Sequence, residues 1–557
     1  MSTTLSGLYL RERAVWIQPS EAFLPASPAP QVQRPNLLYK KRIGATFRRA
    51  LWRSGCCNRS TTSAALPTPA GPGVQAVEEP VTRTPVDSSV LIQGFGWTSC
   101  DQQDWYDQIK FKVPELKEAG FTHIWLPPPS QSVSRQGYLP AQLYNLNSCY
   151  GNKEQLQSLT WALNYAGIKP VADIVINHRC ADVQNAEGIW NSYRDDVHHH
   201  GRRIDWGSWA VCRDDWHFGG TGALKTGASY HPAPDLDYTN DELRAALKDW
   251  LLWLRHEIGF MGWRFDFVKG YAPKFVKEYV DASIVGDSLH VAEFWVDMRW
   301  YGNTMDYDQD APRQVLCDWI TNSGGGVAAF DFPTKGILQE AVRYTQYDRL
   351  RDRNGRASGL LGWWPQKACT FIDNHDTGSS QQHWPFPESH IGLGYAYILT
   401  HPGLPCVAWE HMWDPRHTFI VTQLMAMRRR QDIHAGSKLE ILCADRRMYV
   451  AKVDNRVVIK LGPQHDMGTL LPVPSQGWRL CITGHDFAVW EKGLMELAPA
   501  SAGPDGSTSD IRGLTGSGES HVGLCGWSVQ YSTCIPPSSL CIGFNSETSM
   551  PLFQTTT

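Results

Sequence analysis

Short runs of apolar, β-branched and aromatic residues alternate with longer stretches in which apolar positions recur every three or four residues. The short runs are typical of buried strands, and the longer stretches of amphipathic helices. The short runs begin near Val90, His123, Val171, Gly262, His290, Ala328, Cys369 and Pro405. Such alternation predicts a parallel sheet, and eight strands can close into a barrel. We therefore expect an α/β fold, a (β/α)8 TIM barrel over residues 88–433.

Two segments depart from this alternation. About 60 residues rich in His, Gly, Arg and Asp, 179–238, follow the third strand, and they predict a domain inserted into the barrel. Residues 434–492 contain short runs with a period of two, which predicts a C-terminal antiparallel β-sandwich domain. Residues 501–557 have five charged residues and little periodicity, so we expect a disordered tail.

Composition narrows the classes of partner. The 557 residues carry 52 basic and 56 acidic side chains, a net charge of −4, so the basic surface of a nucleic-acid-binding protein is missing. No apolar run approaches the roughly 20 residues of a membrane span. The 24 Trp, 20 Tyr and 19 Phe are more rings than packing requires, and flat rings also stack on sugars. We expect a carbohydrate partner, with no nucleic acid and no membrane.

The N-terminal segment, residues 1–77, has the composition of a targeting sequence. It holds ten Arg or Lys against two Glu, is rich in Ser, Thr, Ala and Pro, and lacks the apolar stretch of a secretory signal. It resembles an organelle transit peptide, so we expect a chloroplast or other plastid location. The alternative is a disordered extension without a targeting role, on a cytoplasmic protein.

Polar residues stand at the ends of four predicted strands, where the reacting groups of a (β/α)8 barrel lie. These strand ends are Asn177-His178, Arg264-Phe265-Asp266, Glu293-Phe294-Trp295 and Asn374-His375-Asp376. The sequence therefore predicts three carboxylates at one mouth of the barrel.

The surroundings of these carboxylates differ. Arg264 and Asp266 lie on the same face of a strand, so the guanidinium is expected to keep Asp266 ionised as a nucleophile. Glu293 has apolar and aromatic neighbours, which raise a carboxyl pKa toward the range of a general acid. Such a pair, about 5 to 5.5 Å apart, cleaves glycosidic bonds with retention. Asp376 would stabilise the oxocarbenium-like transition state.

Four strings resemble, in order, the four signature regions of the α-amylase family. They are Asp173-Ile-Val-Ile-Asn-His178, Gly262-Trp-Arg-Phe-Asp266, Ala292-Glu-Phe-Trp295 and Phe371-Ile-Asp-Asn-His-Asp376. The likeness to plant-type members covers about residues 88–492. It implies a catalytic barrel with an insertion after strand three, a C-terminal β domain, and retaining endo-hydrolysis of α-1,4-glucosidic bonds in starch and related glucans.

The resemblance also assigns residues. It implies that the catalytic residues are Asp266, Glu293 and Asp376. The candidate substrate-binding residues are Tyr138, His178, Arg264, Lys269, Trp295 and His375. Plant relatives use a tryptophan pair matching Trp363 and Trp364 as a surface starch platform, although this pair could instead simply pack a helix.

The resemblance further implies one structural Ca²⁺ between barrel and insertion. Its ligands would be the positions that match Asn177, Ala228, Asp235 and Gly270. The sequence departs from the pattern because Lys225 stands where secreted plant enzymes have an acidic residue, and nearby acidic positions read Gly220 and Ser229. Calcium takes six to eight oxygens, so this ammonium either points away or substitutes for part of the ion's charge.

Two other functions are compatible with the same scaffold. One is a glucan-binding or regulatory homologue that has lost turnover, which the presence of all three carboxylates disfavours. The other is a barrel enzyme that transfers glucosyl units, which the ratio of new reducing ends to transferred product would distinguish. For the hydrolase we expect a monomer whose partner is starch or another α-glucan.

Overall fold

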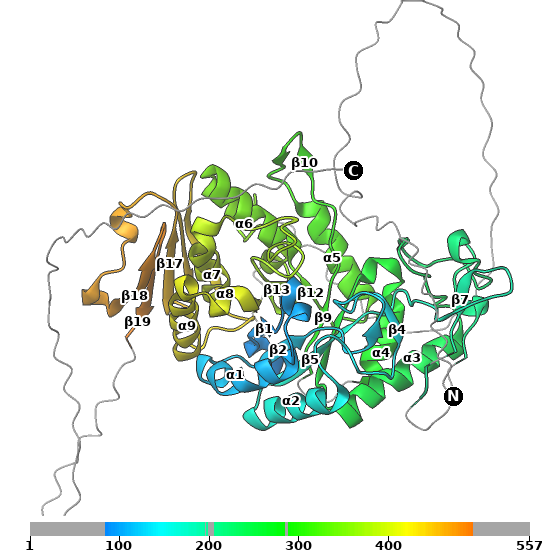
Figure 1. The fold of residues 1–557 in the computed structure, drawn as a ribbon. Coiled ribbons are helices and arrows are strands. Elements are labelled where there is room, and N and C mark those ends of the chain that lie inside the picture. The colour runs from blue at the N-terminus through cyan, green and yellow to red at the C-terminus, as the bar shows by residue number, and fades with distance from the viewer. Residues whose placement is uncertain (1–83, 195, 199–204, 284–287, 494–557) are drawn as a thin grey trace, which may run out of the picture. The chain divides into compact units, whose positions relative to one another are not determined.

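The computed structural model describes residues 84–194, 196–198, 205–283 and 288–493, so the predicted transit peptide and tail lie outside the described residues. Eight parallel strands close into a barrel in the order β1-β14-β13-β12-β9-β8-β5-β2 (Figure 1). They are β1 (Leu91–Gln93), β2 (His123–Leu126), β5 (Lys169–Ile174), β8 (Gly262–Phe265), β9 (His290–Ala292), β12 (Ala328–Phe330), β13 (Ala368–Thr370) and β14 (Leu404–Ala408). Each coincides with a predicted run, and the predicted fold class is confirmed.

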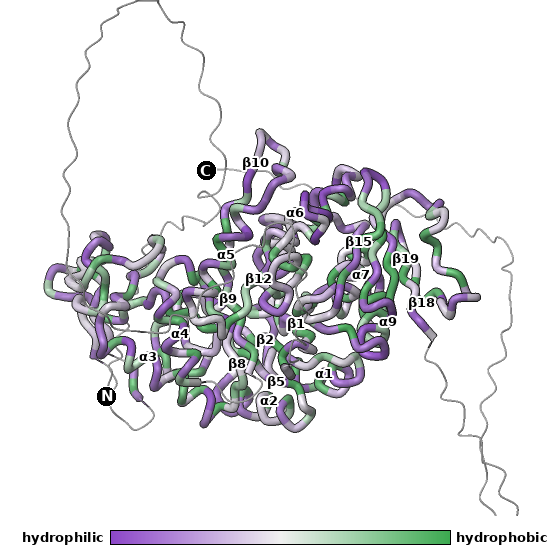
Figure 2. Tube along the Cα trace, turned by 180° about the vertical axis from the view of Figure 1, so that it is seen from behind, coloured by the Kyte–Doolittle hydropathy of each residue, from purple (hydrophilic) through white to green (hydrophobic). Residues whose placement is uncertain are grey.

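Nine α-helices occur in the described residues. They are α1 (Trp105–Ala119), α2 (Lys153–Ala166), α3 (Asp241–Trp253), α4 (Pro273–Ser283), α5 (Asp310–Asn322), α6 (Phe332–Tyr344), α7 (Ile391–Thr400), α8 (Trp409–Trp413) and α9 (Pro415–Arg430). The hydrophobic residues gather along the barrel strands (Figure 2). Within this part of the chain, no helix combines the length and apolar character needed to cross a bilayer.

Helix α3 illustrates how the sequence sets these elements. Leu243, Leu247 and Leu251 recur at four-residue steps and are all buried, as expected for the core-facing stripe of a helix. The side chain of Asn240 accepts a hydrogen bond from the Leu243 amide and caps the first turn. After α3 a single π-helical turn ends at Gly259, whose φ of +95° favours glycine.

The segment after β5 leaves the barrel and returns to it. Its regular structure includes the hairpin of β6 (Val183–Gln184) and β7 (Trp190–Ser192). Isolated bridges pair His178 with Asp235 and Val211 with Leu236, so the end of the segment lies beside the chain that leaves β5. Two further hairpins, β3 (Gln131–Ser132) with β4 (Pro140–Gln142) and β10 (Trp300–Tyr301) with β11 (Thr304–Met305), lie outside the barrel sheet.

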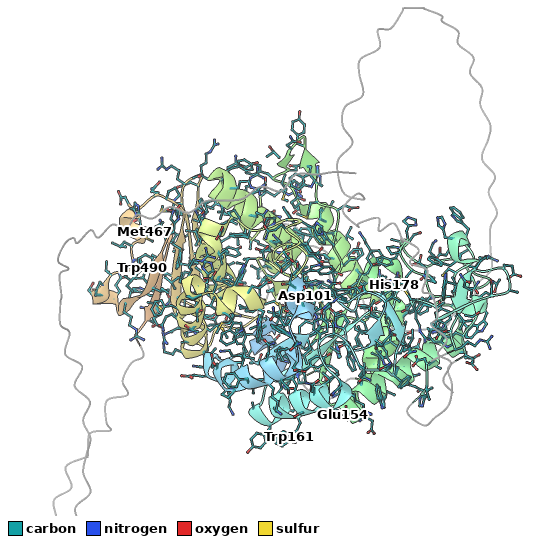
Figure 3. All side chains as sticks on the ribbon, in the orientation of Figure 1. Asp101, Glu154, Trp161, His178, Met467 and Trp490 are labelled. Atoms are coloured by element: carbon teal, nitrogen blue, oxygen red, sulfur yellow. The ribbon has the colours of Figure 1, made fainter. Side chains whose placement is uncertain are left out.

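The C-terminal residues form one five-stranded antiparallel sheet in the order β15-β16-β17-β19-β18. Its strands are β15 (Leu439–Ala444), β16 (Tyr449–Val453), β17 (Val457–Leu461), β18 (Trp478–Gly484) and β19 (Phe487–Lys492). One face joins the barrel's hydrophobic core, and the other carries a separate cluster that includes Met467 and Trp490 (Figure 3). The predicted antiparallel domain is confirmed, but the described residues form a single sheet in place of a sandwich. Helices α7 and α9 pack on this sheet, and the loop residue Met467 packs in the separate cluster.

Candidate active site

Arg264 in β8 joins three carboxylates in the barrel. Its Nη1 donates hydrogen bonds to Asp173 Oδ1 at 2.7 Å and to Asp266 Oδ1 at 2.6 Å. Its Nη2 lies 3.0 Å from Glu293 Oε2 as an ion pair. The Arg264 side chain is 1% exposed, so its charge is compensated by these groups rather than by water. The predicted neighbours Asp266 and Glu293 therefore share one guanidinium.

Backbone pairing places Asp266 and Glu293 at the same end of the barrel. The Asp266 amide donates to the carbonyl of Ile174 at 3.0 Å, and the Glu293 amide to that of Phe265 at 2.9 Å. The amide of Phe267 donates to Glu293 Oε2 at 3.1 Å. Phe267 has a φ of +42°, a backbone conformation that non-glycine residues seldom adopt. Both catalytic candidates are thus fixed from the backbone as well as by Arg264.

Asp376, after β13, is the most exposed of the three predicted catalytic carboxylates, with 22% of its side chain accessible. Gln381 Nε2 donates to its Oδ1 at 3.0 Å, and His375 Nε2 lies 3.4 Å from its Oδ2. His375 is itself held by Gln93, with 2.8 Å between Nε2 of Gln93 and Nδ1 of the ring. The side chains that orient Asp376 thus come from two distant parts of the chain.

The two buried carboxyl groups differ in acidity. Burial raises the pKa of Glu293 to about 8 and that of Asp266 to about 6, while Arg264 lowers both and the charge of Asp376 raises both. The order agrees with Glu293 as acid and Asp266 as nucleophile. Asp266 nevertheless lies above its ordinary pKa, because burial and the neighbouring carboxylates Asp173 and Asp376 outweigh the guanidinium.

Aromatic rings lie next to these carboxylates. Tyr138 stacks against His375 with 5.2 Å between centroids and 2° between planes, and Trp97 lies parallel to both. The Tyr138 hydroxyl donates to Asp173 Oδ2 at 2.8 Å, which holds this ring beside Arg264. Parallel flat rings at a barrel mouth are suited to the apolar face of a sugar.

Comparisons with known proteins agree with this geometry. Residues 103–314 match the family described as "Alpha amylase, catalytic domain", and residues 430–491 match "Alpha-amylase C-terminal beta-sheet domain". The chain is 43% identical over 406 residues to probable alpha-amylase 2 of Arabidopsis thaliana, which covers 72% of this chain and 94% of that protein. The chain belongs to the α-amylase family.

One further relative and one solved structure are similar to this chain. It is 44% identical over 402 residues to alpha-amylase 3, chloroplastic, of Arabidopsis thaliana, across 72% of this chain but 44% of that protein's length. The crystal structure of an α-amylase from Geobacillus thermoleovorans complexed with acarbose is similar with a TM-score of 0.51 and 19% identity, over 74% of this chain and all of that one. That structural likeness supports the fold alone.

The predicted substrate-binding residues of this α-amylase family member differ in surroundings. His178 lies where the insertion joins the barrel (Figure 3), and its ring stacks on Tyr230 at 3.9 Å, while its Nε2 is 2.8 Å from the carbonyl oxygen of Tyr138. Burial lowers the pKa of His178 and of His375 to about 4, so both rings are neutral at pH 7. They act as hydrogen-bonding groups rather than cations.

Two more predicted substrate contacts, Trp295 and Lys269, follow Glu293 and Asp266 within three residues. Trp295 is half-buried and stacks on Phe332, with 4.9 Å between centroids and 18° between planes. Lys269 is half-buried with its Nζ 5.6 Å from the ring of Phe267, the residue whose amide holds Glu293. Substrate contact by these two residues stays a prediction.

The tryptophan pair that is predicted to form a surface glucan site is only partly accessible to solvent. Trp363 and Trp364 are both half-buried. The guanidinium carbon of Arg313 lies 3.9 Å from the centroid of the Trp363 ring, and Trp364 packs against the hydrophobic core. Any glucan contact would therefore use one exposed face or edge of each ring.

Several residues that shape the site are not among the residues predicted from the sequence. Asp173 anchors both Arg264 and Tyr138, and it also accepts from the indole of Trp125 at 3.1 Å. A carboxylate opening the first signature string was a usable signal for Asp173. The other such residues, Gln93, Trp97, Tyr230 and Gln381, lie in contexts without a recognisable motif.

The predicted calcium positions come together where the insertion meets the barrel, but the carboxylate of Asp235 already has partners. Asp235 Oδ1 accepts from Asn177 Nδ2 at 3.0 Å, and both Asp235 oxygens accept from the amide of Tyr230 at 3.2 Å. Lys225 Nζ lies 3.8 Å from Asp235 Oδ2. Calcium needs six to eight oxygens that face the ion. Because N–H groups and an ammonium face Asp235 instead, this arrangement does not fit Ca²⁺.

The positions of the other two predicted ligands are set by backbone contacts. The Ala228 amide donates to the carbonyl of Lys269 at 2.8 Å, and the Gly270 amide to that of Phe267 at 3.0 Å. A side chain at Gly270 would collide with the Asn177 amide oxygen, so glycine is required for this close approach. These contacts join the insertion to the loop that follows Asp266.

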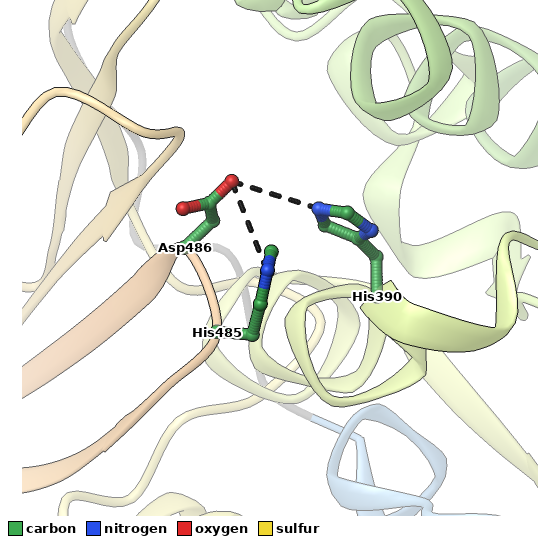
Figure 4. A group of neighbouring side chains, drawn as sticks. All are labelled: His390, His485 and Asp486. Atoms are coloured by element: carbon green, nitrogen blue, oxygen red, sulfur yellow. Dashed lines mark ion pairs between the residues drawn. The ribbon is translucent and has the colours of Figure 1, made fainter.

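Among the described residues, His390, His485 and Asp486 form a group with metal-ligand atoms (Figure 4). The Asp486 carboxylate lies 3.6 Å from His390 and 3.8 Å from His485. Two imidazoles and one carboxylate are a poor set for calcium, which prefers oxygen. The group is therefore no substitute for the predicted calcium ligands, and it joins the start of α7 to the turn between β18 and β19.

Proposed function

We propose that this protein is a retaining, endo-acting α-amylase that hydrolyses α-1,4-glucosidic bonds in starch and related glucans. The observation that carries the proposal is the single buried guanidinium of Arg264 placed between Asp266 and Glu293. The relatives named as α-amylases support the reaction class. The proposed separation of the two carboxyl groups is about 5 to 5.5 Å, as in retaining enzymes.

The first half of the proposed reaction breaks the glycosidic bond. The protonated carboxyl of Glu293 gives its proton to the leaving oxygen, while a carboxylate oxygen of Asp266 attacks the anomeric carbon. The C1–O bond to the leaving chain breaks, and an ester between C1 and Asp266 forms. Asp376 stabilises the positive charge that develops on the sugar ring, and Arg264 disperses the negative charge on Asp266.

The second half releases the sugar. Glu293, now ionised, takes a proton from a water molecule, whose oxygen attacks the anomeric carbon and displaces Asp266. Both carboxyl groups return to their starting protonation states, and two inversions leave the anomeric configuration unchanged. In this proposal Tyr138 and Trp97 stack on the sugar, and the neutral rings of His178 and His375 hydrogen-bond to its hydroxyl groups.

The experiment that tests the proposal follows soluble starch with the full chain. Iodine colour and new reducing ends are measured together, and the anomer of the first products is read by proton NMR. We expect iodine colour to fall well before reducing ends accumulate, with α-anomers formed first. Initial β-anomers would contradict the retaining mechanism, and starch binding without product would support the catalytically silent homologue.

The acidities of the two buried carboxyl groups predict a bell-shaped pH dependence of kcat/KM. Asp266 must be ionised to attack, so activity should fall as pH drops below about 6. Glu293 must be protonated to act as acid, so activity should fall as pH rises above about 8. Initial rates on a soluble maltooligosaccharide, measured from about pH 4 to about pH 10, check this. A profile flat through both limbs would contradict it.

We also propose that Trp363 and Trp364 bind starch away from the barrel mouth. The double variant Trp363→Ala, Trp364→Ala should bind insoluble starch granules about 30-fold more weakly, since stacking contributes about 1 kcal/mol for each of the two rings removed. The kcat of this double variant on a short soluble maltooligosaccharide should stay unchanged. Granule sedimentation and the soluble assay measure the two effects. Equal losses in both assays would indicate that the pair only packs the core.

We propose a plastid location and a monomeric state. The basic, Ser- and Thr-rich composition of residues 1–77 supports import, and one relative is named chloroplastic. Fusing residues 1–77 to a fluorescent reporter tests the location, and a diffuse cytosolic signal would contradict it.

Light scattering on the eluted full chain tests the proposed monomeric state, and a mass of two chains would contradict it.

A further inference from the structure

We propose that Lys225 takes the place of a calcium ion at the junction between the insertion and the barrel, so that the stability of this enzyme does not depend on calcium. The proposal concerns the support of the site rather than its reaction. It stands whether or not the proposed hydrolysis is correct, because none of the contacts on which it rests involves Asp266, Glu293 or Asp376.

The ammonium of Lys225 points into the junction. Its side chain is 13% exposed, and its Nζ donates to the carbonyl oxygen of Asp214 at 3.0 Å. The same Nζ lies 3.8 Å from Asp235 Oδ2 and 3.9 Å from Asp214 Oδ2. Because the positive charge is shared by two carboxylates and largely withdrawn from water, it does the electrostatic work expected of a bound cation.

The backbone fixes Lys225 in this position. The Lys225 amide donates to Asp214 Oδ1 at 2.9 Å, so the same aspartate holds the residue at both its amide and its ammonium. On the other side, the Asp235 amide donates to Asp215 Oδ2 at 2.9 Å. The carboxylates at the junction are thus held in a network to which Lys225 contributes a positive charge.

Neither Gly220 nor Ser229 adds a further carboxylate to the junction. A side chain at Gly220 would collide with the carbonyl oxygens of Cys212 and Val211, so no acidic residue fits there. Ser229 is exposed and carries no charge. Of the three positions that the resemblance singles out, two are therefore uncharged in this chain, and the third is a cation.

The segment that follows Lys225 is docked against the active-site loop. The amide of Ala272 donates to Thr226 Oγ1 at 3.1 Å, and a side chain at Gly227 would collide with the carbonyl oxygen of Lys269. These barrel residues follow Asp266 within a few positions. Lys225 therefore helps to hold this segment of the insertion against the loop that follows Asp266, the proposed nucleophile.

The test measures melting temperature and metal content on the full chain. The parent protein, purified without added calcium, should hold substoichiometric calcium by elemental analysis, and its Tm should change by less than about 1 °C between excess EGTA and about 1 mM CaCl₂. Lys225→Glu restores an acidic residue. In EGTA its Tm should fall by at least about 3 °C, because a buried pair becomes a repulsion, and CaCl₂ should recover most of that loss.

Two further variants complete the test. Lys225→Met keeps the apolar stem without the charge, so its Tm should fall and should not respond to CaCl₂. The Tm of Lys225→Met still tests the proposal if Lys225→Glu does not fold. Lys277→Glu on α4 is the control, because Lys277 is 50% exposed and pairs with a neighbour in the same helix, and its Tm should not respond to either addition.

Two results would overturn the proposal. The first is a parent protein that retains about one calcium per chain and melts several degrees lower in EGTA. The second is a Lys225→Met protein that melts at the parent temperature in EGTA. Both readouts are independent of starch hydrolysis, so a failure here is distinguishable from a failure of the proposed reaction.

Discussion

Replacing Asp266 by Asn is expected to lower kcat on soluble starch by about 10⁴- to 10⁶-fold. The amide has nearly the shape of the carboxyl but cannot form the ester with the anomeric carbon. Arg264 keeps Asp173 and Glu293 as partners, so the protein should fold. Initial rates of reducing-end formation give kcat, and the far-UV circular dichroism spectrum with the Tm checks the fold.

A matched variant separates this effect from the loss of any carboxylate. Asp241→Asn changes a side chain that is 92% exposed at the start of α3, and it should retain the parent rate. If Asp266→Asn keeps more than about a tenth of the parent kcat, Asp266 is not the nucleophile. A folded but inactive Asp266→Asn protein that still binds starch granules is the expected result.

Replacing Glu293 by Gln should lower kcat/KM on starch by about 10²- to 10⁴-fold, because the amide cannot protonate the leaving oxygen. The loss should depend on the leaving group. A maltosyl fluoride releases an anion that needs no proton, so its bond cleavage should suffer much less than that of starch. Stopped assays of fluoride release and of reducing ends measure the two rates.

The same variant also tests which group sets the alkaline limb. With Gln at position 293, the decline in kcat/KM above about pH 8 should disappear while the acid limb near pH 6 stays. Equal losses on starch and on the fluoride, with an unchanged alkaline limb, would assign the proton donor to another residue. The conservative change Glu293→Asp tests position, because the shorter carboxyl is displaced from the amide of Phe267.

The barrel and the carboxylates at its mouth were predictable from the sequence for physical reasons. Strands buried on both sides read as short apolar runs, and all eight did so. Polar residues directly after such runs must lie at one rim, because parallel strands end on the same side. Asp266 and Glu293 therefore came together in prediction and in structure, and the contact of Arg264 with Asp266 followed from the period of the strand. The ion pair of Arg264 with Glu293 was not predicted.

The contacts that come from loops were not predictable in the same way. Gln93 and Trp97 contact His375 across 282 and 278 residues of sequence, and no local pattern encodes such a pairing. The direction of the Lys225 side chain also depends on Asp214, whose position is set by the folded insertion. The acidity of Asp266 was misjudged because one neighbour, Arg264, was visible in sequence while burial was not.

The single C-terminal sheet has a consequence for how the protein comes apart. All ten residues of α7 are buried, and α7 packs on β17 and β19 while α9 packs on β18. The apolar core runs without interruption from the barrel into the sheet. Heat should therefore melt barrel and sheet in one cooperative transition. The sheet is therefore not an independent domain. A chain that ends before β15 would expose the apolar side of α7 to solvent, and it would aggregate instead of forming a smaller enzyme.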